Sequence, residues 1–152
     1  MKLPMNDNKI KFYLNGQQVE ANCDETIWQV SNRLGIEIPH LCYSDKPGYR
    51  ADGNCRACMV EIEGERVLAA SCIRKPSENM NVITSSKKAK KSRELVFELL
   101  LSDQPEKEIA HDSNSAFWNW IDKVEVKESR FPKKTSCQAD ISHPSMAVNL
   151  DA

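Results

Sequence analysis

Four cysteines constrain this chain more than any other feature of its sequence. They follow the pattern C-x12-C-x2-C-x13-C and are Cys42, Cys55, Cys58 and Cys72. The close pair follows a loop that contains Gly48, Gly53 and Asn54. Glycine adopts positive φ without steric cost and has no side chain, so such a loop can wrap closely around a small inorganic core. The spacing therefore predicts that the four thiolates converge on one metal cluster.

The order of the four cysteines is that of plant-type 2Fe–2S ligands: a single cysteine, a C-x2-C pair and a distant fourth. The first interval is longer here, which lengthens a loop and leaves the order intact. A disulfide framework would require an oxidising compartment, which nothing in the sequence indicates. A structural zinc site usually has two C-x2-C pairs, and this chain has one. Buried unreactive cysteines are common but are not expected at ligand spacing around a glycine loop. The predicted cofactor is one 2Fe–2S cluster.

The segments before the cysteines predict a hairpin and a helix. Apolar residues alternate with polar ones in KIKFYL, and Asn15-Gly16 is a strong signal for a tight turn into the returning strand QQVEA. Asp24 or Thr26 can cap a helix, and Gly35 can end it. Its expected apolar face consists of Ile27, Val30 and Leu34. A hairpin followed by a helix is typical of the opening of a β-grasp fold in the α+β class.

The segments after the close pair predict a second hairpin and a last strand. MVEI alternates again, Glu63-Gly64 turns the chain, and residues 67–69 lead back to Cys72. The close pair and Cys72 would thus lie at the two ends of one hairpin, which would make the site rigid. Asn79 is expected in left-handed geometry before the last strand, at residues 81–84.

Residues 86–126 are expected to form a helical extension. Ser85-Ser86 can cap a long helix that ends near Leu101, and its lysine-rich first half is interpreted as a solvated face, with a docking patch as the alternative. Ser113 or Ser115 can cap a short helix at residues 116–121. The predicted apolar faces are Leu95, Val96, Leu99 and Leu100 on the long helix, and Phe117, Trp120, Ile121 and Val124 on the short one.

Several segments resemble a known group of proteins. PHLCY, GNCRACMVEI, ERVLAASC and SRELVFELLLSDQP resemble the N-terminal 2Fe–2S domain of the large subunits of complex I, NAD-reducing hydrogenases and NAD-dependent formate dehydrogenases. The resemblance runs from about residue 9 to 105. AHDSNSAFWNWIDKV, RFP and HPSMAVNLDA resemble the alpha subunit of soluble molybdenum formate dehydrogenases. The resemblance implies that Cys42, Cys55, Cys58 and Cys72 carry over as cluster ligands. Gly53, Asn54, Arg56 and Ala57 are expected to shape the loop around them.

One departure favours the formate dehydrogenase branch. In complex I the long helix leads into a histidine and three cysteines that hold a 4Fe–4S cluster, whereas this chain has no cysteine between Cys72 and Cys137. That second site is expected to be absent, with His111 a surface or capping residue rather than a ligand. The implied partners are a flavin-containing NAD-reducing subunit and a molybdopterin-containing catalytic subunit or domain. The alternatives are the equivalent part of an NAD-reducing hydrogenase or complex I-like enzyme, or a cluster-bearing scaffold without electron transfer.

The net charge, the apolar runs and the first residues of the chain limit its possible partners and location. A net charge of −1 does not favour nucleic acid, and no apolar run approaches the roughly 20 residues of a membrane helix. The first residues lack the apolar core of a signal peptide, so a cytoplasmic location is expected. No acid–base pair or nucleophile stands out, so no catalytic centre is expected. Cys23 is expected to be a structural or free thiol, and Cys137 a free thiol.

The expected domains are a β-grasp 2Fe–2S ferredoxin domain at 9–85, the helical extension at 86–126 and a loop-like, flexible tail at 127–152. Related alpha subunits continue past HPSMAVNLDA into a C-x2-C-x2-C run, whereas this chain stops at Ala152. The expectation is a fragment, a split gene product or a shortened form.

Overall fold

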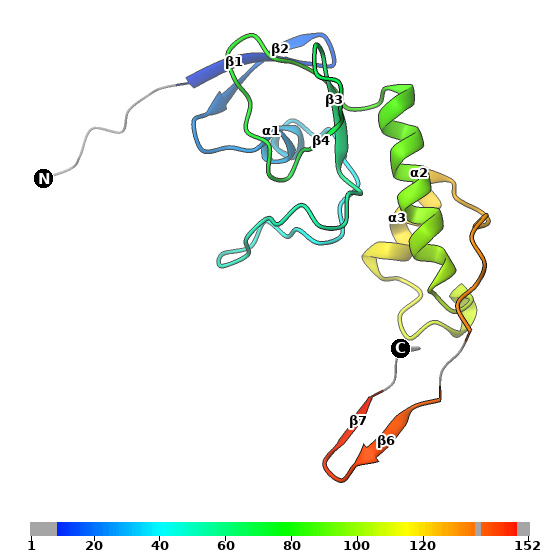
Figure 1. The fold of residues 1–152 in the computed structure, drawn as a ribbon. Coiled ribbons are helices and arrows are strands. Elements are labelled where there is room, and N and C mark those ends of the chain that lie inside the picture. The colour runs from blue at the N-terminus through cyan, green and yellow to red at the C-terminus, as the bar shows by residue number, and fades with distance from the viewer. Residues whose placement is uncertain (1–8, 136–137, 149–152) are drawn as a thin grey trace, which may run out of the picture. The chain divides into compact units, whose positions relative to one another are not determined.

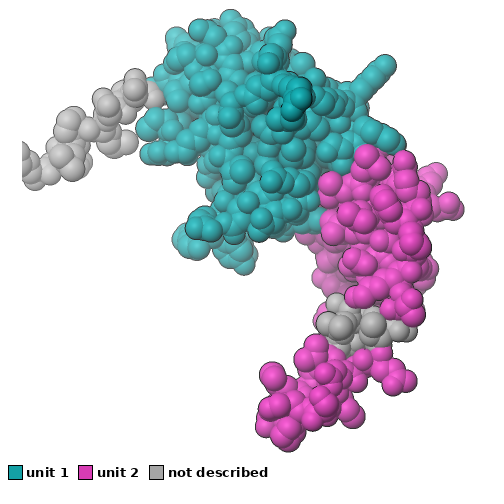
Figure 2. All heavy atoms as spheres, viewed as in Figure 1, with its two compact units in different colours: residues 1–93 teal, residues 94–152 magenta. Residues whose placement is uncertain are grey.

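The computed structural model describes residues 9–135 and 138–148. The prediction for Cys137 lies outside these residues. The chain divides into two compact units, residues 1–93 and 94–152, which Figure 2 colours separately. The division between these units falls within the long helix that the sequence predicts after residue 85, so the first residues of that helix belong to the first unit.

A five-stranded mixed sheet forms the framework of the first unit (Figure 1). Its strands are β1 (Lys9–Leu14), β2 (Gln17–Asn22), β3 (Met59–Ile62), β4 (Ala69–Ala70) and β5 (Asn81–Ile83). The spatial order is β2-β1-β5-β3-β4. Strand β5 pairs parallel with β1 and antiparallel with β3. The last strand of this unit in the sequence therefore lies in the middle of the sheet and joins its two hairpins.

The first hairpin forms as the sequence predicts. Asn15 and Gly16 both adopt positive φ, 51° and 81°, and Phe12 pairs with Val19 across the two strands. Phe12 and Leu14 are fully buried, because alternate residues of a strand point to the same face. The buried face of β1 thus supplies the centre of the core.

Helix α1 (Ile27–Arg33) begins at Thr26, which settles the choice between the two predicted caps. The Thr26 hydroxyl accepts a hydrogen bond from the Gln29 N–H, and the Gln29 side chain accepts one from the Thr26 N–H. The predicted apolar face is wrong at Leu34, which is 44% exposed. The helix has only seven residues, so Leu34 falls at its C-cap and Gly35, at φ +73°, turns the chain away. Trp28 is buried instead.

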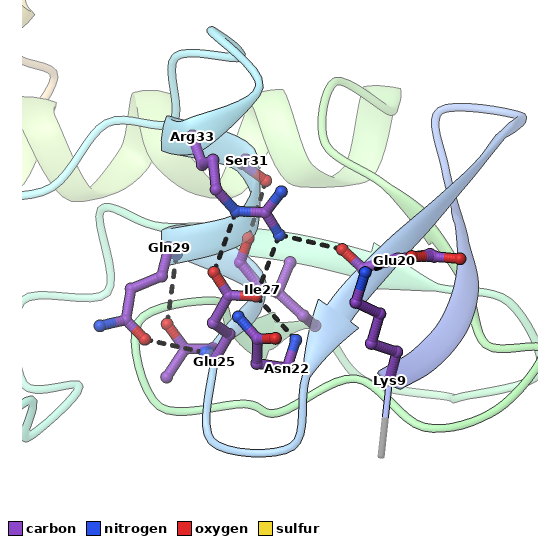
Figure 3. A network of polar contacts seen from close by, with 9 residues as sticks. Lys9, Glu20, Asn22, Glu25, Ile27, Gln29, Ser31 and Arg33 are labelled. Carbon is purple, nitrogen blue, oxygen red and sulfur yellow. Dashed lines mark hydrogen bonds and ion pairs between the residues drawn. The ribbon is translucent and has the colours of Figure 1, made fainter. Parts of the chain in front are cut away.

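A polar network ties α1 to the first hairpin (Figure 3). The Arg33 guanidinium donates to both carboxylate oxygens of Glu25, at 3.0 and 2.9 Å, and to the Glu20 carbonyl oxygen of β2 at 2.9 Å. The Glu25 carboxylate also accepts from the Asn22 N–H at 2.8 Å. These contacts fix the turn between β2 and α1, and so the start of the helix.

Helix α2 (Lys87–Ser102) begins after Ser86, whose hydroxyl accepts from the Ala89 N–H at 3.1 Å. The predicted apolar face is wrong at Leu99, which is 54% exposed. Ala89, Arg93 and Phe97 are among the residues that the helix buries. Their spacing of four residues places them along one stripe of the helix, which the sequence does not reveal because a charged residue interrupts it.

The second unit packs α3 (Ala116–Val124) against the last turns of α2. The rings of Phe97 and Phe117 lie 6.2 Å apart, so the two helices are in contact at these residues. Ile121 of the predicted face is buried, and Phe117, Trp120 and Val124 are partly buried. Trp118 is buried as well, which the sequence does not predict. A 3-10 turn at Lys107–Ile109 lies between the two helices in the sequence.

The predicted loop-like tail contains a two-stranded hairpin, β6 (Asp140–His143) and β7 (Met146–Val148). All of its strand residues are exposed. Upstream of it, the Arg130 guanidinium binds the buried Glu98 carboxylate through two hydrogen bonds of 2.5 and 2.9 Å. Among the described residues, the helices are all too short or too polar to cross a membrane.

Candidate metal centre

The first two cysteines of the pattern meet across a long loop between α1 and β3, which Figure 1 shows extending away from the sheet. The Cys55 N–H donates to the Cys42 Sγ at 3.5 Å. Both cysteines are half-buried. The loop therefore closes on itself at these two residues, although twelve residues separate them in the sequence.

The other two cysteines meet at the open end of the β3–β4 hairpin. Met59 pairs with Ala70, so Cys58, just before β3, and Cys72, just after β4, emerge close together. Both are fully buried, at 0% exposure, and each thiol shifts the pKa of the other. The structure thus brings the four predicted cysteines together as two pairs, one half-buried and one in the core.

Helix α1 and Ser71 fix the buried pair, Cys58 and Cys72, which we call the inner pair. The first N–H groups of the helix, from Ile27 and Trp28, donate to the carbonyl oxygens of Arg74 and Ser71 at 2.8 and 3.0 Å. The buried Ser71 hydroxyl donates to the Cys58 carbonyl oxygen at 2.8 Å, alongside the Ser71 N–H at 3.2 Å. These bonds tie the chain around Cys72 both to the helix and to Cys58.

Aromatic packing fixes the chain around Cys42. The Trp28 ring makes edge contacts with His40 and Tyr43, at centroid distances of 4.6 and 5.1 Å. The Tyr43 hydroxyl donates to the Asp45 carboxylate at 2.9 Å and accepts from Gln29 at 3.1 Å. Burial and the bond to Asp45 raise the pKa of Tyr43 to about 12. The burial of Trp28 is not predicted from the sequence, because its spacing from Val30 does not fit a single helical face.

The loop needs glycine at position 53. Gly53 has φ +65°, and a Cβ there would lie 2.9 Å from the Ile73 Cδ1 and 3.6 Å from the Ala70 Cβ. Arg56 is also left-handed, at φ +58°, between two of the cysteines. Ala57 is fully buried. The predicted loop-shaping residues 53, 56 and 57 thus occupy constrained positions, and the left-handed Arg56 is a feature that its residue type does not signal.

The thiols interact electrostatically as one group. The hydrogen bond from Cys72 lowers the pKa of Cys58 to about 6, while the same bond raises the pKa of Cys72. Burial raises the pKa of the Cys55 thiol. Cys72 also interacts with the charges of Cys42 and Cys55, so the two pairs lie within electrostatic reach of each other.

This donor set fits a cluster with two irons. Within residues 9–135 and 138–148, no three His, Cys, Asp or Glu side chains are placed to bind a single metal ion. A 2Fe–2S cluster has no need of such a group, because four cysteines share its two irons. Two adjacent thiol pairs with a glycine loop between them match that requirement.

Comparison with known families decides the nature of the site. Residues 7–87, more than half of the chain, match the family described as 2Fe-2S iron-sulfur cluster binding domain. The chain belongs to this family. Its cofactor is accordingly a 2Fe–2S cluster, as the cysteine spacing predicts.

Curated relatives of this 2Fe–2S domain include two oxidoreductase subunits. One is a subunit of the NADH-quinone oxidoreductase of Rickettsia prowazekii (strain Madrid E), and the other is the NADH-ubiquinone oxidoreductase 75 kDa subunit of Reclinomonas americana. Each is 38% identical over 96 residues, which cover 63% of this chain and 14% of the relative. The aligned part of the chain thus corresponds to about one seventh of these relatives.

A solved structure has the same fold. The crystal structure of an NAD+-reducing [NiFe]-hydrogenase in the H2-reduced state matches with a TM-score of 0.72 at 23% identity. The match covers 89% of this chain and 57% of the hydrogenase chain. It extends beyond the residues of the family match, into the second unit.

Proposed function

We propose that Cys42, Cys55, Cys58 and Cys72 bind one 2Fe–2S cluster, with the half-buried pair at one iron and the buried pair at the other. The observation that carries this proposal is the pairing itself: the Cys55 N–H contacts the Cys42 Sγ, and the buried Cys58 and Cys72 emerge side by side where Met59 pairs with Ala70. Hydrogen bonds from Ser71 and α1 hold the inner pair, so the scaffold itself keeps these ligands in position.

The domain would serve electron transfer. A bound 2Fe–2S cluster accepts and releases one electron at a time, and the protein contributes binding, insulation and tuning of the potential. Cys58 and Cys72 are buried in the core, whereas Cys42 and Cys55 belong to the loop between α1 and β3 and are only half-buried. Electrons would therefore enter and leave on the side of this loop, where the path from the cluster to a partner is shortest.

The larger system would be an NAD-linked oxidoreductase with several subunits. Names of the curated relatives and of the matched structure support this assignment at the level of NADH oxidoreductase and NAD+-reducing hydrogenase. Within that group, an NAD-dependent molybdenum formate dehydrogenase is the parent that we propose, because no cysteine lies between Cys72 and Cys137. The partners would then be a flavin-containing NAD-reducing subunit and a molybdopterin-containing subunit or domain.

The fold that we propose for the first unit is the β-grasp. Its support is the sheet order β2-β1-β5-β3-β4, in which a central strand joins two hairpins and pairs parallel with the first strand. The location in the cytoplasm and the division at 9–85, 86–126 and 127–152 remain predictions from the sequence.

Anaerobic purification of the full chain, with iron and sulfide analysis and EPR after dithionite reduction, tests the ligand set. We expect two irons, two sulfides and one rhombic signal, as a 2Fe–2S cluster requires. Cys55→Ser and Cys58→Ser should lose or alter this signal. Cys23→Ser is the matched control, because Cys23 is an exposed free thiol outside the site. Zinc in place of iron, or a signal that survives every substitution at the four positions, would contradict the proposal.

Reduction by physiological donors distinguishes the possible parent systems. The loaded chain is mixed with candidate flavin subunits and NADH, and then with formate- or hydrogen-oxidising partners. Rapid reduction through a formate-oxidising partner would support the proposed parent, and reduction only through a hydrogen-oxidising partner would favour the hydrogenase alternative. A cluster that no partner reduces, but that dithionite reduces, would favour the scaffold without electron transfer.

A further inference from the structure

Arg93 of α2 carries a buried positive charge, although it is not one of the proposed cluster ligands. It is 7% exposed, although a guanidinium is rarely buried without a carboxylate partner. Its partners are main-chain carbonyl groups. The Met59 oxygen accepts from Nε at 3.0 Å and from Nη2 at 2.6 Å, and the Thr84 oxygen accepts from Nη2 at 2.6 Å.

These partners place the guanidinium next to the inner cysteine pair. Met59 directly follows Cys58, and its carbonyl oxygen accepts two of the three hydrogen bonds. Burial lowers the pKa of Arg93, and the negative charge of the Cys58 thiolate opposes that shift.

We propose that Arg93 sets the reduction potential of the cluster, as a fixed positive charge on the side of Cys58. The inference rests on the proposed ligand set, because the charge acts through the proximity of Cys58. The four thiolates and the cluster are net negative, and reduction adds one further negative charge. A nearby cation that water does not screen therefore stabilises the reduced form more than the oxidised form and raises the potential.

The expected size follows from the Coulomb interaction. Two unit charges about 10 Å apart, at an effective dielectric constant of about 20, change an equilibrium constant by about tenfold. For one electron a tenfold change corresponds to about 59 mV. Loss of the Arg93 charge should therefore make the cluster about tenfold harder to reduce.

The experiment is an EPR-monitored redox titration of the full loaded chain at fixed pH and ionic strength. Arg93→Met and Arg93→Gln remove the charge, and glutamine keeps a donor for the carbonyl groups. Arg93→Lys keeps the charge. Lys90→Met is the matched control, since it removes one charge from an exposed position of the same helix.

We expect the potential to fall by about 59 mV in the two neutral variants and to stay near the parent value in Arg93→Lys and Lys90→Met. Unchanged potentials in neutral variants with full iron and sulfide content would overturn the proposal. Loss of the cluster from both neutral variants would also overturn it, because Arg93 would then be needed for folding rather than for the potential. A parent chain without a 2Fe–2S signal would instead contradict the proposed function itself.

Discussion

Replacement of Gly53 by alanine tests whether the loop between the cysteines needs its backbone geometry. Gly53 has φ +65°, a conformation that costs an L-residue about 1–2 kcal/mol. The new Cβ would also lie 2.9 Å from the Ile73 Cδ1, the far end of a side chain that is 45% exposed, so Ile73 would have to shift at a cost of about 0.5 kcal/mol. The sum predicts a loss of about 1.5–2.5 kcal/mol for Gly53→Ala.

Gly48→Ala is the matched control. Gly48 lies in the same loop at φ +87°, and a Cβ there would meet nothing within 4 Å. Only the backbone cost of about 1–2 kcal/mol should apply. Since 1 kcal/mol shifts the Tm of a domain of 60–100 residues, such as the first unit, by about 4–8 °C, Gly53→Ala should melt about 2–4 °C below Gly48→Ala.

The assay is thermal unfolding of the loaded, oxidised chain at one scan rate, followed by the visible absorption of the cluster and by circular dichroism. Ile73→Ala gives the decisive cross-check, because it removes the atom that the new Cβ would meet. In that background the extra loss at position 53 should vanish, which a double-mutant cycle measures directly. Equal melting temperatures for Gly53→Ala and Gly48→Ala would refute the reasoning from the Ile73 contact, and no loss in either variant would refute the reasoning from φ.

Two further predictions concern the supports of the site. Thr26→Ala should cost about 1 kcal/mol of stability, because helix α1 loses its N-cap. Asp24→Ala should be nearly neutral, because the Asp24 side chain forms an exposed ion pair with Lys75. Thermal unfolding of both variants measures this difference, and a larger loss for Asp24→Ala would contradict the cap assignment. Ser71→Ala should cost about 1–3 kcal/mol of stability, because the Cys58 carbonyl oxygen loses the hydrogen bond from the buried Ser71 hydroxyl. Anaerobic denaturant unfolding measures the loss. An unchanged midpoint would show that the Ser71 N–H alone satisfies this carbonyl oxygen.

Local sequence determined the parts of this protein that depend on near neighbours. The turn at Asn15-Gly16 forms because both residues tolerate positive φ, and Asn79, at φ +60°, is left-handed as predicted. The order of the four cysteines identifies the cofactor because a cluster requires a fixed set of donors. Alternation in β1 predicts the buried Phe12 and Leu14, since side chains of a strand point to its two faces in turn.

Tertiary structure decided what depends on distant partners. The central place of β5 cannot be read from its sequence, because pairing with β1 and β3 is a choice among distant strands. Leu34 and Leu99 are exposed despite an apolar pattern, because the end of one helix and the orientation of the other decide which side is covered. Arg93 is the clearest case. Its sequence context suggests a solvated helix face, and only the fold brings carbonyl groups and Cys58 close enough to hold a buried charge.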